Sequence, residues 1–338
     1  MAGLILVTGG TGYIGSHTCV ALINAGYHVI ILDNLSNSSA NVLKRLNQIA
    51  GQTPHFIQGD IRDRALLDKV FADNRIAAVI HFAGLKSVGE SVAKPIEYYD
   101  NNVRGTIELL SAMEAAKVRT FVFSSSATVY GDPKSVPIRE DFSRSATNPY
   151  GRSKVIVEDI LEDMHRSNPE WNIARLRYFN PVGAHPSGLI GEDPKGIPNN
   201  LMPYISQVAV GRRERLRIYG NDYPTPDGTG VRDYIHVMDL AEGHVFALRF
   251  CQDKGGMLTV NLGTGEGSSV LQVIHAFEKA SSRPIPYEIV ARRAGDIAQC
   301  WADPSLAFTK LGWKATRGLA EMCEDSWRWQ NNNPEGIQ

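Results

Sequence analysis

The sequence predicts an α/β fold in which helices cover both faces of a doubly wound parallel sheet. Short apolar segments alternate with helical ones through the first half of the chain, and a glycine-rich turn at Gly9–Gly15 follows the first of them. This alternation favours parallel pairing, because each crossover helix returns the chain to the same end of the sheet. With 338 residues and 43% hydrophobic content, the chain is long enough for one large domain and a smaller one.

The first predicted strand, Leu4–Thr8, runs into the glycine-rich turn and then into an amphipathic helix that continues to Ala25. We assign Gly9 to a tight turn, Gly12 to close approach of a pyrophosphate and Gly15 to close packing of the helix on the strand. The N-terminus of that helix then faces the phosphates. The alternative is an ordinary turn with close packing.

The second strand, His28–Leu32, ends in Asp33, eighteen residues after Gly15. An acidic side chain at this position accepts hydrogen bonds from both hydroxyls of an adenosine ribose and repels a 2′-phosphate. The alternative is an aspartate that caps a helix or shapes the turn over residues 33–37. Its position directly after the second strand favours ribose binding, and therefore NAD over NADP as the cofactor.

The remaining elements of the first half continue the alternation. We expect a helix near Asn41–Ala50, a strand at His55–Gln58, a further helix, a strand at Ala77–Phe82, a long helix over about Val92–Ala116 and a strand at Thr120–Ser124. Ligands of such sheets bind beyond the carboxyl ends of the strands. Those ends carry Gly9, Asp33, Asp60-Ile61, Phe82–Lys86 and Ser124–Ser126. Polar and glycine-rich segments therefore converge on one edge.

The second half is richer in loops. Proline and glycine breaks follow one another between Asn180 and Asn200, and residues 221–230 form another loop-rich stretch. Helices are expected near 201–210, 238–250, 270–280 and 319–329, with strands near 173–177, 216–219 and 260–263. We expect a nucleotide-binding domain over residues 1–180, to which segments near 231–265 return, and a mainly substrate-binding domain over residues 181–338.

Tyr150 and Lys154 stand four residues apart, which places both side chains on one face of a predicted helix. A phenol has an ordinary pKa near 10, so a nearby ammonium and a cationic cofactor are needed to ionise it at neutral pH. Taken alone the spacing is weak, because two surface residues at helical spacing are common. The nucleotide-binding signals elsewhere in the chain create the need for a base.

Composition argues against several other classes of protein. Thirty-five basic and thirty-six acidic residues give a formal charge of −1, so no overall field favours a nucleic-acid polymer or an anionic membrane. The widely separated cysteines, Cys19, Cys251, Cys300 and Cys323, indicate neither a metal site nor a disulfide framework. The N-terminal apolar stretch is too short for a signal peptide, and no segment approaches the roughly 20 apolar residues of a membrane span. We expect a cytoplasmic protein.

Several segments together resemble a known family. They are Thr8–Gly15, Ser124–Gly131, Tyr150–Lys154, Arg177–Pro181 and Asp233–Val237, and the stretch Tyr223–Tyr234 is especially close. They are similar to the extended short-chain dehydrogenase/reductase superfamily and, within it, to the UDP-glucose (UDP-galactose) 4-epimerases, over nearly the whole chain. The resemblance implies a Rossmann-type NAD-binding domain, a smaller α/β domain that binds UDP-sugars, and a role in galactose and carbohydrate metabolism.

The resemblance also implies a reaction. Tyr150 takes the proton from the sugar 4-hydroxyl while the C4 hydride passes to NAD; the 4-keto sugar then turns about its diphosphate and receives the hydride on its other face. There is no net redox change, so NAD stays bound. Lys154 stabilises the phenolate and binds the nicotinamide ribose, and Ser126 hydrogen-bonds the reacting oxygen. The alternative for Ser126 is a strand-end hydroxyl that satisfies backbone groups.

The resemblance implies two sets of binding residues. The cofactor contacts are Gly9, Gly12, Tyr13, Ile14, Gly15, Asp33, Asn34, Asn37, Asp60, Ile61, Phe82, Ala83, Gly84, Lys86, Asn101, Ser124, Tyr150, Lys154 and Tyr178, with Asp60 and Ile61 at the adenine. The UDP-sugar contacts are Lys86, Ser126, Tyr150, Phe179, Asn180, Asn200, Leu201, Tyr219, Arg232, Arg293, Asp296 and Cys300. Arg232 and Arg293 suit the diphosphate, because guanidinium groups bind phosphate oxygens in pairs. Tyr219 is expected against the uracil. The alternatives are solvated arginines and ordinary core aromatic residues.

Cys300 bears on the size of the sugar. In the family, the residue that follows the Gly295-Asp296 loop, shortly before Trp301, flanks the sugar, and a bulky aromatic residue there leaves little space at the 2-substituent. A cysteine leaves room for an N-acetyl group, so activity on UDP-N-acetylglucosamine and UDP-N-acetylgalactosamine is also expected. The alternative is that Cys300 simply fills a pocket wall.

Two other functions are compatible with this fold. Nucleotide-sugar 4,6-dehydratases carry Thr-Asp-Glu where this chain has Ser126-Ala127-Thr128, so the acid and base that dehydration needs are missing. A catalytically silent NAD-binding regulator is the second alternative, and an intact Ser126, Tyr150 and Lys154 argue against it. The helices around Val92–Ala116 and Tyr150–His165 resemble those that pair in family dimers, so we expect a homodimer.

Overall fold

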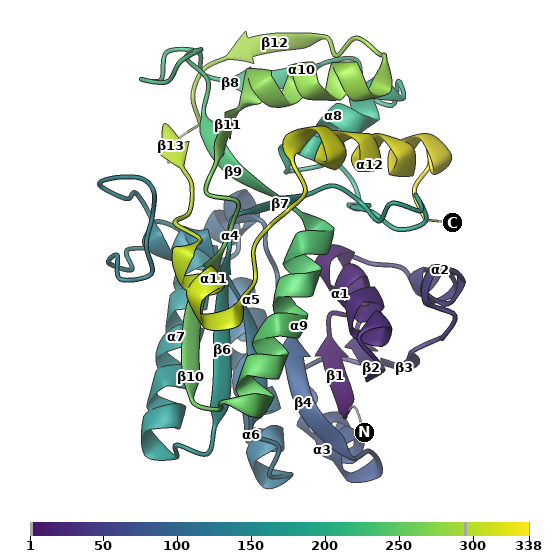
Figure 1. Ribbon diagram of the computed structural model, residues 1–338, viewed down its shortest axis with the longest axis vertical. Coiled ribbons are helices and arrows are strands. Elements are labelled where there is room, and N and C mark those ends of the chain that lie inside the picture. The colour runs from purple at the N-terminus through teal and green to yellow at the C-terminus, as the bar shows by residue number, and fades with distance from the viewer. Residues whose placement is uncertain (1–2, 294–295, 338) are drawn as a thin grey trace.

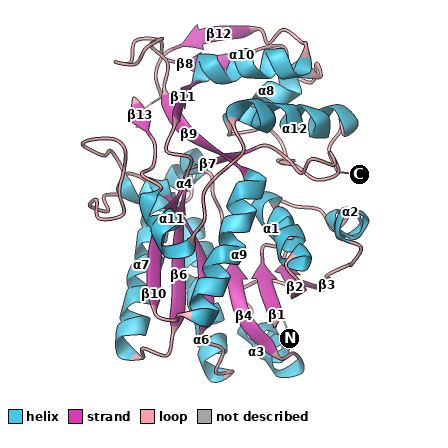
Figure 2. Cartoon of the chain, in the orientation of Figure 1, coloured by secondary structure: helices cyan, strands magenta, loops and turns pink. Residues whose placement is uncertain are grey.

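The computed structural model describes residues 3–293 and 296–337. A seven-stranded parallel sheet stands between helices in the lower part of the molecule, and a smaller unit of helices and short strands lies above it (Figures 1 and 2). The sheet and its covering helices confirm the predicted α/β fold class. The carboxyl ends of the sheet strands point toward the smaller unit (Figure 1).

The sheet follows the order β10-β6-β5-β4-β1-β2-β3. Its strands are β1 (Leu4–Thr8), β2 (His28–Asp33), β3 (His55–Gln58), β4 (Ile76–His81), β5 (Thr120–Ser126), β6 (Asn172–Tyr178) and β10 (Met257–Leu262). The chain moves outward from β1 to β3 and then returns to the other side of β1 as β4. Connections that leave β1 and β4 in opposite directions open a crevice for ligands at this switch point.

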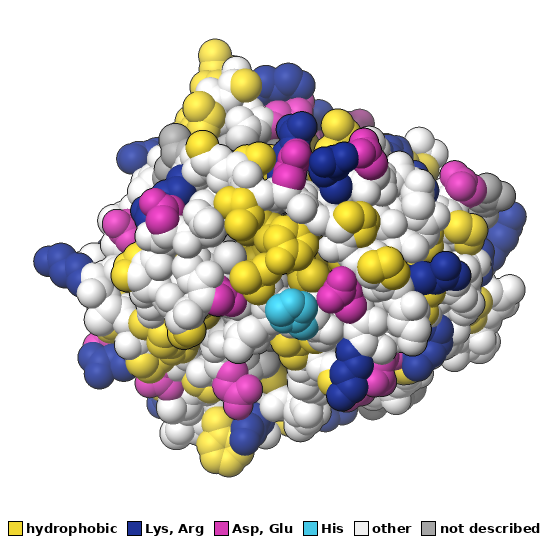
Figure 3. Space-filling view, turned by 90° about the horizontal axis from the view of Figure 1, so that it is seen from above, with side chains coloured by type: hydrophobic (Ala, Val, Ile, Leu, Met, Phe, Trp, Pro, Cys, Tyr) yellow, Lys and Arg dark blue, Asp and Glu magenta, His cyan; other side chains and the backbone are white. Residues whose placement is uncertain are grey.

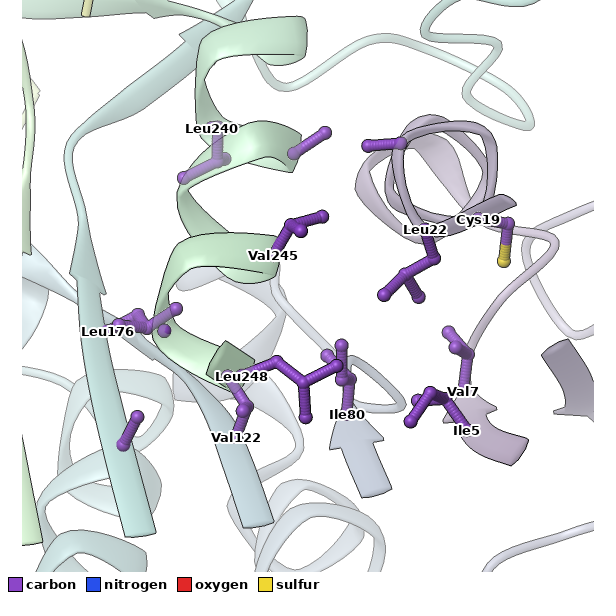
Figure 4. Packing of buried hydrophobic residues seen from close by; sticks show 14 of the residues in the cluster. Ile5, Val7, Cys19, Leu22, Ile80, Val122, Leu176, Leu240, Val245 and Leu248 are labelled. Carbon is purple, nitrogen blue, oxygen red and sulfur yellow. The ribbon is translucent and has the colours of Figure 1, made fainter. Parts of the chain in front are cut away.

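Helices cover both faces of the sheet. They are α1 (Tyr13–Asn24), α2 (Val42–Ala50), α3 (Arg64–Asp73), α6 (Gly105–Ala115), α7 (Pro149–Ser167), α9 (Val237–Asp253) and α11 (Ser305–Leu311). The prediction that α1 is amphipathic is wrong, because every residue from Gly15 to Leu22 is buried. Helix α9 packs on α1 and covers the side that would otherwise face water. Figure 4 shows Leu22 of α1 meeting Val245 and Leu248 of α9 above the sheet strands.

The prediction of one long helix over Val92–Ala116 is also wrong. Helix α4 (Val88–Ala93) ends just before Pro95, α5 (Pro95–Tyr99) begins at that proline, and a π-helical turn over Asp100–Arg104 leads into α6. Proline interrupts a helix because it has no amide hydrogen and its ring clashes with the preceding turn. The π turn contains two consecutive asparagines, Asn101 and Asn102, and Asn102 is the buried one.

The smaller unit is built around β9 (Val231–His236), which pairs with three short strands. These are β7 (Asn180–Val182), β11 (Gly267–Ser269) and β13 (Gln299–Cys300), while β8 (Leu216–Tyr219) pairs with β12 (Tyr287–Val290). Helices α8 (Leu201–Ala209), α10 (Val270–Ser281) and α12 (Leu319–Asn332) complete it. A short 3-10 turn at Ala127–Tyr130 directly follows β5. The sequence did not predict β7, β9, β11, β12 or β13. Strand β9 leads directly into α9, and β10 pairs along its full length with β6, so both halves of the chain contribute to the large sheet.

The surface carries mixed charge. Figure 3 shows basic and acidic side chains interspersed on the face seen from above, as expected from the near-balanced composition. Across residues 3–293 and 296–337, no helix combines the length and apolarity needed to cross a bilayer.

Candidate active site

The glycine-rich turn between β1 and α1 lies against the loop that follows β4. Gly9 adopts φ +71°, in the left-handed region that favours glycine, and a Cβ there would lie 2.7 Å from the amide nitrogen of Ala83. A Cβ at Gly15 would lie 2.3 Å from the carbonyl oxygen of Gly9, so the helix packs on the turn itself. No side chain caps α1 at Gly12, which leaves backbone N–H groups at its N-terminus for an anion. Beside them, Ile14 packs against the core and Tyr13 donates to the carbonyl oxygen of Gly183 at 2.7 Å.

Asp33 lies at the end of β2 with its carboxylate fixed in place. It accepts hydrogen bonds from Thr11 N at 3.1 Å, Leu35 N at 2.9 Å and Ser38 Oγ at 3.2 Å. Other predicted adenosine contacts gather at the same end of the sheet: Asn34 Nδ2 donates to Asp60 Oδ2 at 3.0 Å, and Asn37 Oδ1 accepts from Lys195 N at 3.4 Å.

Ile61, the other residue expected at the adenine, has its side chain in the hydrophobic core. It is only 5% exposed, and a Cβ at Gly105 would lie 2.6 Å from Ile61 Cδ1, so its side chain packs beneath α6.

Asn102 holds the loop that follows β4, and sequence reasoning missed it. Its side chain accepts from Leu85 N at 2.8 Å, and donates to Leu85 O at 2.9 Å and to Ser153 Oγ at 3.1 Å. Asn101, the predicted cofactor contact, is only half-buried and donates to Asn102 Oδ1 at 2.9 Å. The two asparagines are adjacent in the sequence, and only the π turn decides which one is buried.

The same loop reaches the helix that carries Tyr150 and Lys154. A Cβ at Gly84 would lie 3.8 Å from Lys154 Nζ. The predicted residues Phe82, Ala83 and Gly84 therefore line the path between the glycine-rich turn and Lys154.

Lys154 is held against the end of β5. Helix α7 begins at Pro149, where Asn148 Oδ1 accepts from Gly151 N at 2.9 Å, and this start directs the Lys154 face toward the sheet. Lys154 Nζ donates to the carbonyl oxygen of Ser124 at 2.8 Å and lies 5.9 Å from the centroid of the Tyr150 ring. Burial lowers the pKa of Lys154 to about 8, and the charge of Glu158 opposes that shift.

Ser126 accepts hydrogen bonds from Thr128, a residue to which sequence reasoning gave no role in the site. Ser126 Oγ accepts from Thr128 N at 3.2 Å and from Thr128 Oγ1 at 3.0 Å, so its own hydroxyl hydrogen is free to be donated. Burial raises the pKa of Tyr150, while a hydrogen bond from Ser126 and the charge of Lys86 both lower it. Thr128 therefore polarises Ser126 in the direction that favours the Tyr150 phenolate.

Glu192 joins two predicted substrate residues from opposite sides of the crevice. Its Oε1 accepts from Lys86 Nζ at 3.0 Å and from Asn200 Nδ2 at 2.8 Å. Asn200 precedes α8 without capping it, so the backbone N–H groups from Leu201 onward stay available at the start of that helix. Sequence reasoning missed Glu192, because Lys86, its charged partner, is distant in the chain.

One group of predicted substrate residues gathers around β9. Arg232 and Cys300 are paired in register across β9 and β13, and Asn180 Nδ2 donates to Asp233 O at 2.9 Å. Cys300 is half-buried against an apolar cluster that includes Phe179 and Tyr130. Burial raises the pKa of the Cys300 thiol to about 11, with Arg232 opposing, so the thiol stays protonated at neutral pH.

A second group lies on the strand pair β8 and β12 and the loop beyond it. The Arg293 guanidinium lies 4.4 Å from the centroid of the Tyr219 ring, and its Nε donates to Asp296 Oδ2 at 3.0 Å. This loop approaches the first group, since Ala298 O lies 3.5 Å from the guanidinium of Arg232. Gly295 lies outside the described residues.

The site contains no feature of a metal centre within the described part of the chain. There, no group of three His, Cys, Asp or Glu side chains is placed to hold an ion. All four cysteines are free.

Comparison with known proteins agrees with this geometry. A family model described as GDP-mannose 4,6 dehydratase matches residues 6–326. The UDP-glucose 4-epimerase of Bacillus subtilis (strain 168) is 62% identical, over 99% of this chain and 98% of the relative. The crystal structure of a UDP-glucose 4-epimerase from Stenotrophomonas maltophila, with bound NAD and formylated UDP-arabinopyranose, superposes with a TM-score of 0.97 at 53% identity, covering 98% of this chain and 99% of that one. The Bifidobacterium longum enzyme, in complex with NAD+ and UDP, gives 0.96 at 57% identity, with the same coverage.

The name of the family model is that of a dehydratase, but the site differs from one. Ala127 and Thr128 follow Ser126, and neither side chain supplies a carboxylate. The relatives with about 60% identity over nearly the whole chain are epimerases. The chain therefore belongs to the UDP-glucose 4-epimerases of the extended short-chain dehydrogenase/reductase superfamily.

Proposed function

We propose that this chain catalyses the NAD-dependent, reversible epimerisation at C4 of UDP-hexoses, and interconverts UDP-glucose and UDP-galactose through a 4-keto intermediate. The observation that carries the proposal is the convergence at one strand end of a Ser126 hydroxyl polarised toward Tyr150 and a buried Lys154. The proposal also places the reaction in the cytoplasm, where thiols such as the four free cysteines stay reduced.

The residues around the glycine-rich turn fit NAD. The uncapped start of α1 suits a pyrophosphate, and the fixed carboxylate of Asp33 suits the two hydroxyls of an adenosine ribose. Close contact between Gly9 and Ala83 keeps the floor of the crevice free of side-chain bulk. When bound, NAD supplies the hydride acceptor for C4 and the hydride donor for the return step.

The protein residues move the proton. Tyr150 accepts the proton of the sugar 4-hydroxyl as the C4 hydride leaves. After the sugar has turned and C4 has taken the hydride back on its other face, Tyr150 returns the proton to the 4-oxygen. Ser126 donates to the oxygen of Tyr150 and thereby lowers its pKa. Arg232, Arg293 and the start of α8 hold the diphosphate while the sugar turns, because guanidinium and backbone N–H groups bind phosphate oxygens.

The test is the interconversion of UDP-glucose and UDP-galactose by the purified protein without added NAD, together with the mass and absorbance of any nucleotide that the protein carries. Bound NAD and product formation in both directions support the proposal. If the protein binds NAD and interconverts neither these sugars nor their N-acetyl forms, a non-catalytic NAD-binding regulator replaces it.

Cys300→Tyr is expected to select against N-acetylated sugars. The turnover of UDP-N-acetylglucosamine should fall by about tenfold to a hundredfold relative to that of UDP-glucose, since an over-large side chain in a packed wall costs about 1–3 kcal/mol. The measurement is kcat/KM for both sugar pairs before and after the substitution. Cys300→Ser, which stays small, serves as the control. Unchanged N-acetyl turnover in Cys300→Tyr means that other residues set the sugar size.

A homodimer is part of the proposal, and an apolar surface on α4, α5 and α6 supports it. Val92 is 64% exposed and Ile96 is 82% exposed there. Beside them a surface hollow of about 480 Å³ is lined by Ile96, Tyr99, Asp100, Val103, Arg104, Ile107 and Ile156 of α7. Exposed apolar side chains gathered in this way are typical of protein–protein interfaces.

Ile96→Glu is expected to convert the protein to monomers in sedimentation velocity, because a charge would be buried in the contact. Ile289→Glu is the matched control, since Ile289 is 48% exposed on β12, away from this surface. A dimer that survives Ile96→Glu would place the interface elsewhere.

A further inference from the structure

Tyr178 stands at the head of a buried chain of hydrogen bonds that leads away from the crevice. Its hydroxyl bonds to His244 Nε2, and His244 Nδ1 bonds to the carbonyl oxygen of Leu240 at 2.8 Å. Tyr178 is 7% exposed and His244 is fully buried, so water does not compete for these bonds.

The directions of these two hydrogen bonds follow from the Leu240 carbonyl group, which is the last member of the series. A carbonyl oxygen only accepts, so Nδ1 of His244 carries the hydrogen. Burial lowers the pKa of His244 to about 4, so the ring is neutral at neutral pH and Nε2 carries no hydrogen. Nε2 therefore accepts, and the Tyr178 hydroxyl must donate to it.

The Tyr178 hydroxyl can therefore only accept any further hydrogen bond. Burial also raises the pKa of Tyr178 well above its ordinary value, so the hydroxyl keeps its hydrogen. Its one hydrogen points at His244, and only oxygen lone pairs remain for other partners.

We propose that His244 is a positioning residue, which fixes the Tyr178 hydroxyl as an obligate acceptor toward the N–H groups of a nicotinamide carboxamide. The inference rests on the proposed binding of NAD and on the expected place of Tyr178 at its nicotinamide end. His244 itself belongs to α9, in the second half of the chain, and also contacts the Phe82 ring at a centroid distance of 4.8 Å. The buried imidazole of His244 thus links α9 to Phe82 in the loop after β4 and to the Tyr178 hydroxyl.

The test compares His244→Phe with His244→Gln. Phenylalanine keeps a flat aromatic ring and removes the acceptor, so the Tyr178 hydroxyl is free to rotate and present its hydrogen. Glutamine places an amide oxygen near the former Nε2 and restores an acceptor. We expect His244→Phe to speed the exchange of bound NAD for isotope-labelled NAD by about tenfold, the order expected when a buried polar group loses its partner. His244→Gln should restore exchange to within about threefold of wild type.

Tyr178→Phe completes a double-mutant cycle. Once the hydroxyl is absent, adding His244→Phe should not change NAD exchange further. The melting temperature and the affinity for UDP are measured alongside, because a purely structural role would change the melting temperature and leave NAD exchange unaltered. That result, or additive effects in the cycle, overturns the inference. A protein that carries no NAD and binds none overturns the proposed function as well, whereas wild-type epimerisation with unaltered exchange in His244→Phe overturns the role of His244 alone.

Discussion

Replacing Tyr150 by phenylalanine is expected to lower kcat about a thousandfold while the protein still binds NAD and UDP-sugar. The substitution removes the proton acceptor and almost no volume, and a positioned general base contributes about 10²- to 10⁴-fold. A thousandfold loss corresponds to about 4 kcal/mol of transition-state stabilisation. The measurements are steady-state turnover of UDP-galactose, NAD content and UDP affinity.

Tyr287→Phe is the matched control for this experiment. Tyr287 is 43% exposed on β12, and its substitution removes the same hydroxyl from the surface. It should leave turnover unchanged. Near wild-type turnover in Tyr150→Phe would show that Tyr150 is not the base, and the role would then pass to another group at the crevice.

Glu158→Gln is expected to lower the free energy of unfolding by about 3–5 kcal/mol, because it leaves a buried arginine without its counter-charge. Glu158 is fully buried and Arg177 is 3% exposed, and the two form a two-point contact with distances of 3.0 and 2.7 Å. Glu158 also accepts from Ser125 Oγ at 2.6 Å. Urea-induced unfolding measures the loss.

Glu162→Gln is the control on the same helix. Glu162 lies one turn further along α7 with its side chain 42% exposed, and its ion pairs are with Arg166 and Arg175. An exposed pair of this kind contributes at most about 1 kcal/mol. Equal losses in the two variants would contradict the distinction between buried and exposed pairs.

The effect of Glu158 depends on pH in a stated direction. Burial raises its pKa, but the hydrogen bonds and charge of Arg177 outweigh burial and hold the pKa below the ordinary value of 4.5. A lowered folded-state pKa stabilises the fold fully above the unfolded-state pKa, and that contribution is lost as pH falls through the folded-state value. The stability difference between wild type and Glu158→Gln should therefore be full at pH 7 and shrink below about pH 4.5. A difference that grows on acidification contradicts this assignment.

The parts of the fold that were predicted correctly depend on local patterns. Alternating apolar strands and helices indicate a parallel sheet because each crossover is short and contained within one segment. The glycine-rich turn and Asp33 are recognisable for the same reason, since the backbone conformation of Gly9 and the Asp33 hydrogen bonds with Leu35 and Ser38 involve residues close in the sequence. Tyr150 and Lys154 share a helix face, which their spacing alone specifies.

The errors arose where distant segments meet. Helix α1 was expected to have a solvated face, and α9, more than two hundred residues later, covers it. The helix expected over Val92–Ala116 is interrupted at Pro95 and passes through a π turn that buries Asn102 in preference to Asn101. Both outcomes depend on packing against elements that a local pattern does not contain.

By itself, the sequence determined the fold class, the nucleotide-binding turn and the Tyr150 and Lys154 pair, because each depends on backbone conformation and spacing within one short segment. Only the tertiary structure decided how these groups are oriented. Thr128 donates to Ser126 Oγ, Glu192 joins Lys86 to Asn200 across the crevice, and His244 reaches Tyr178 from α9. Hydrogen-bond direction depends on which donor and acceptor become neighbours in space, and the Glu192 and His244 contacts join segments that only folding brings together.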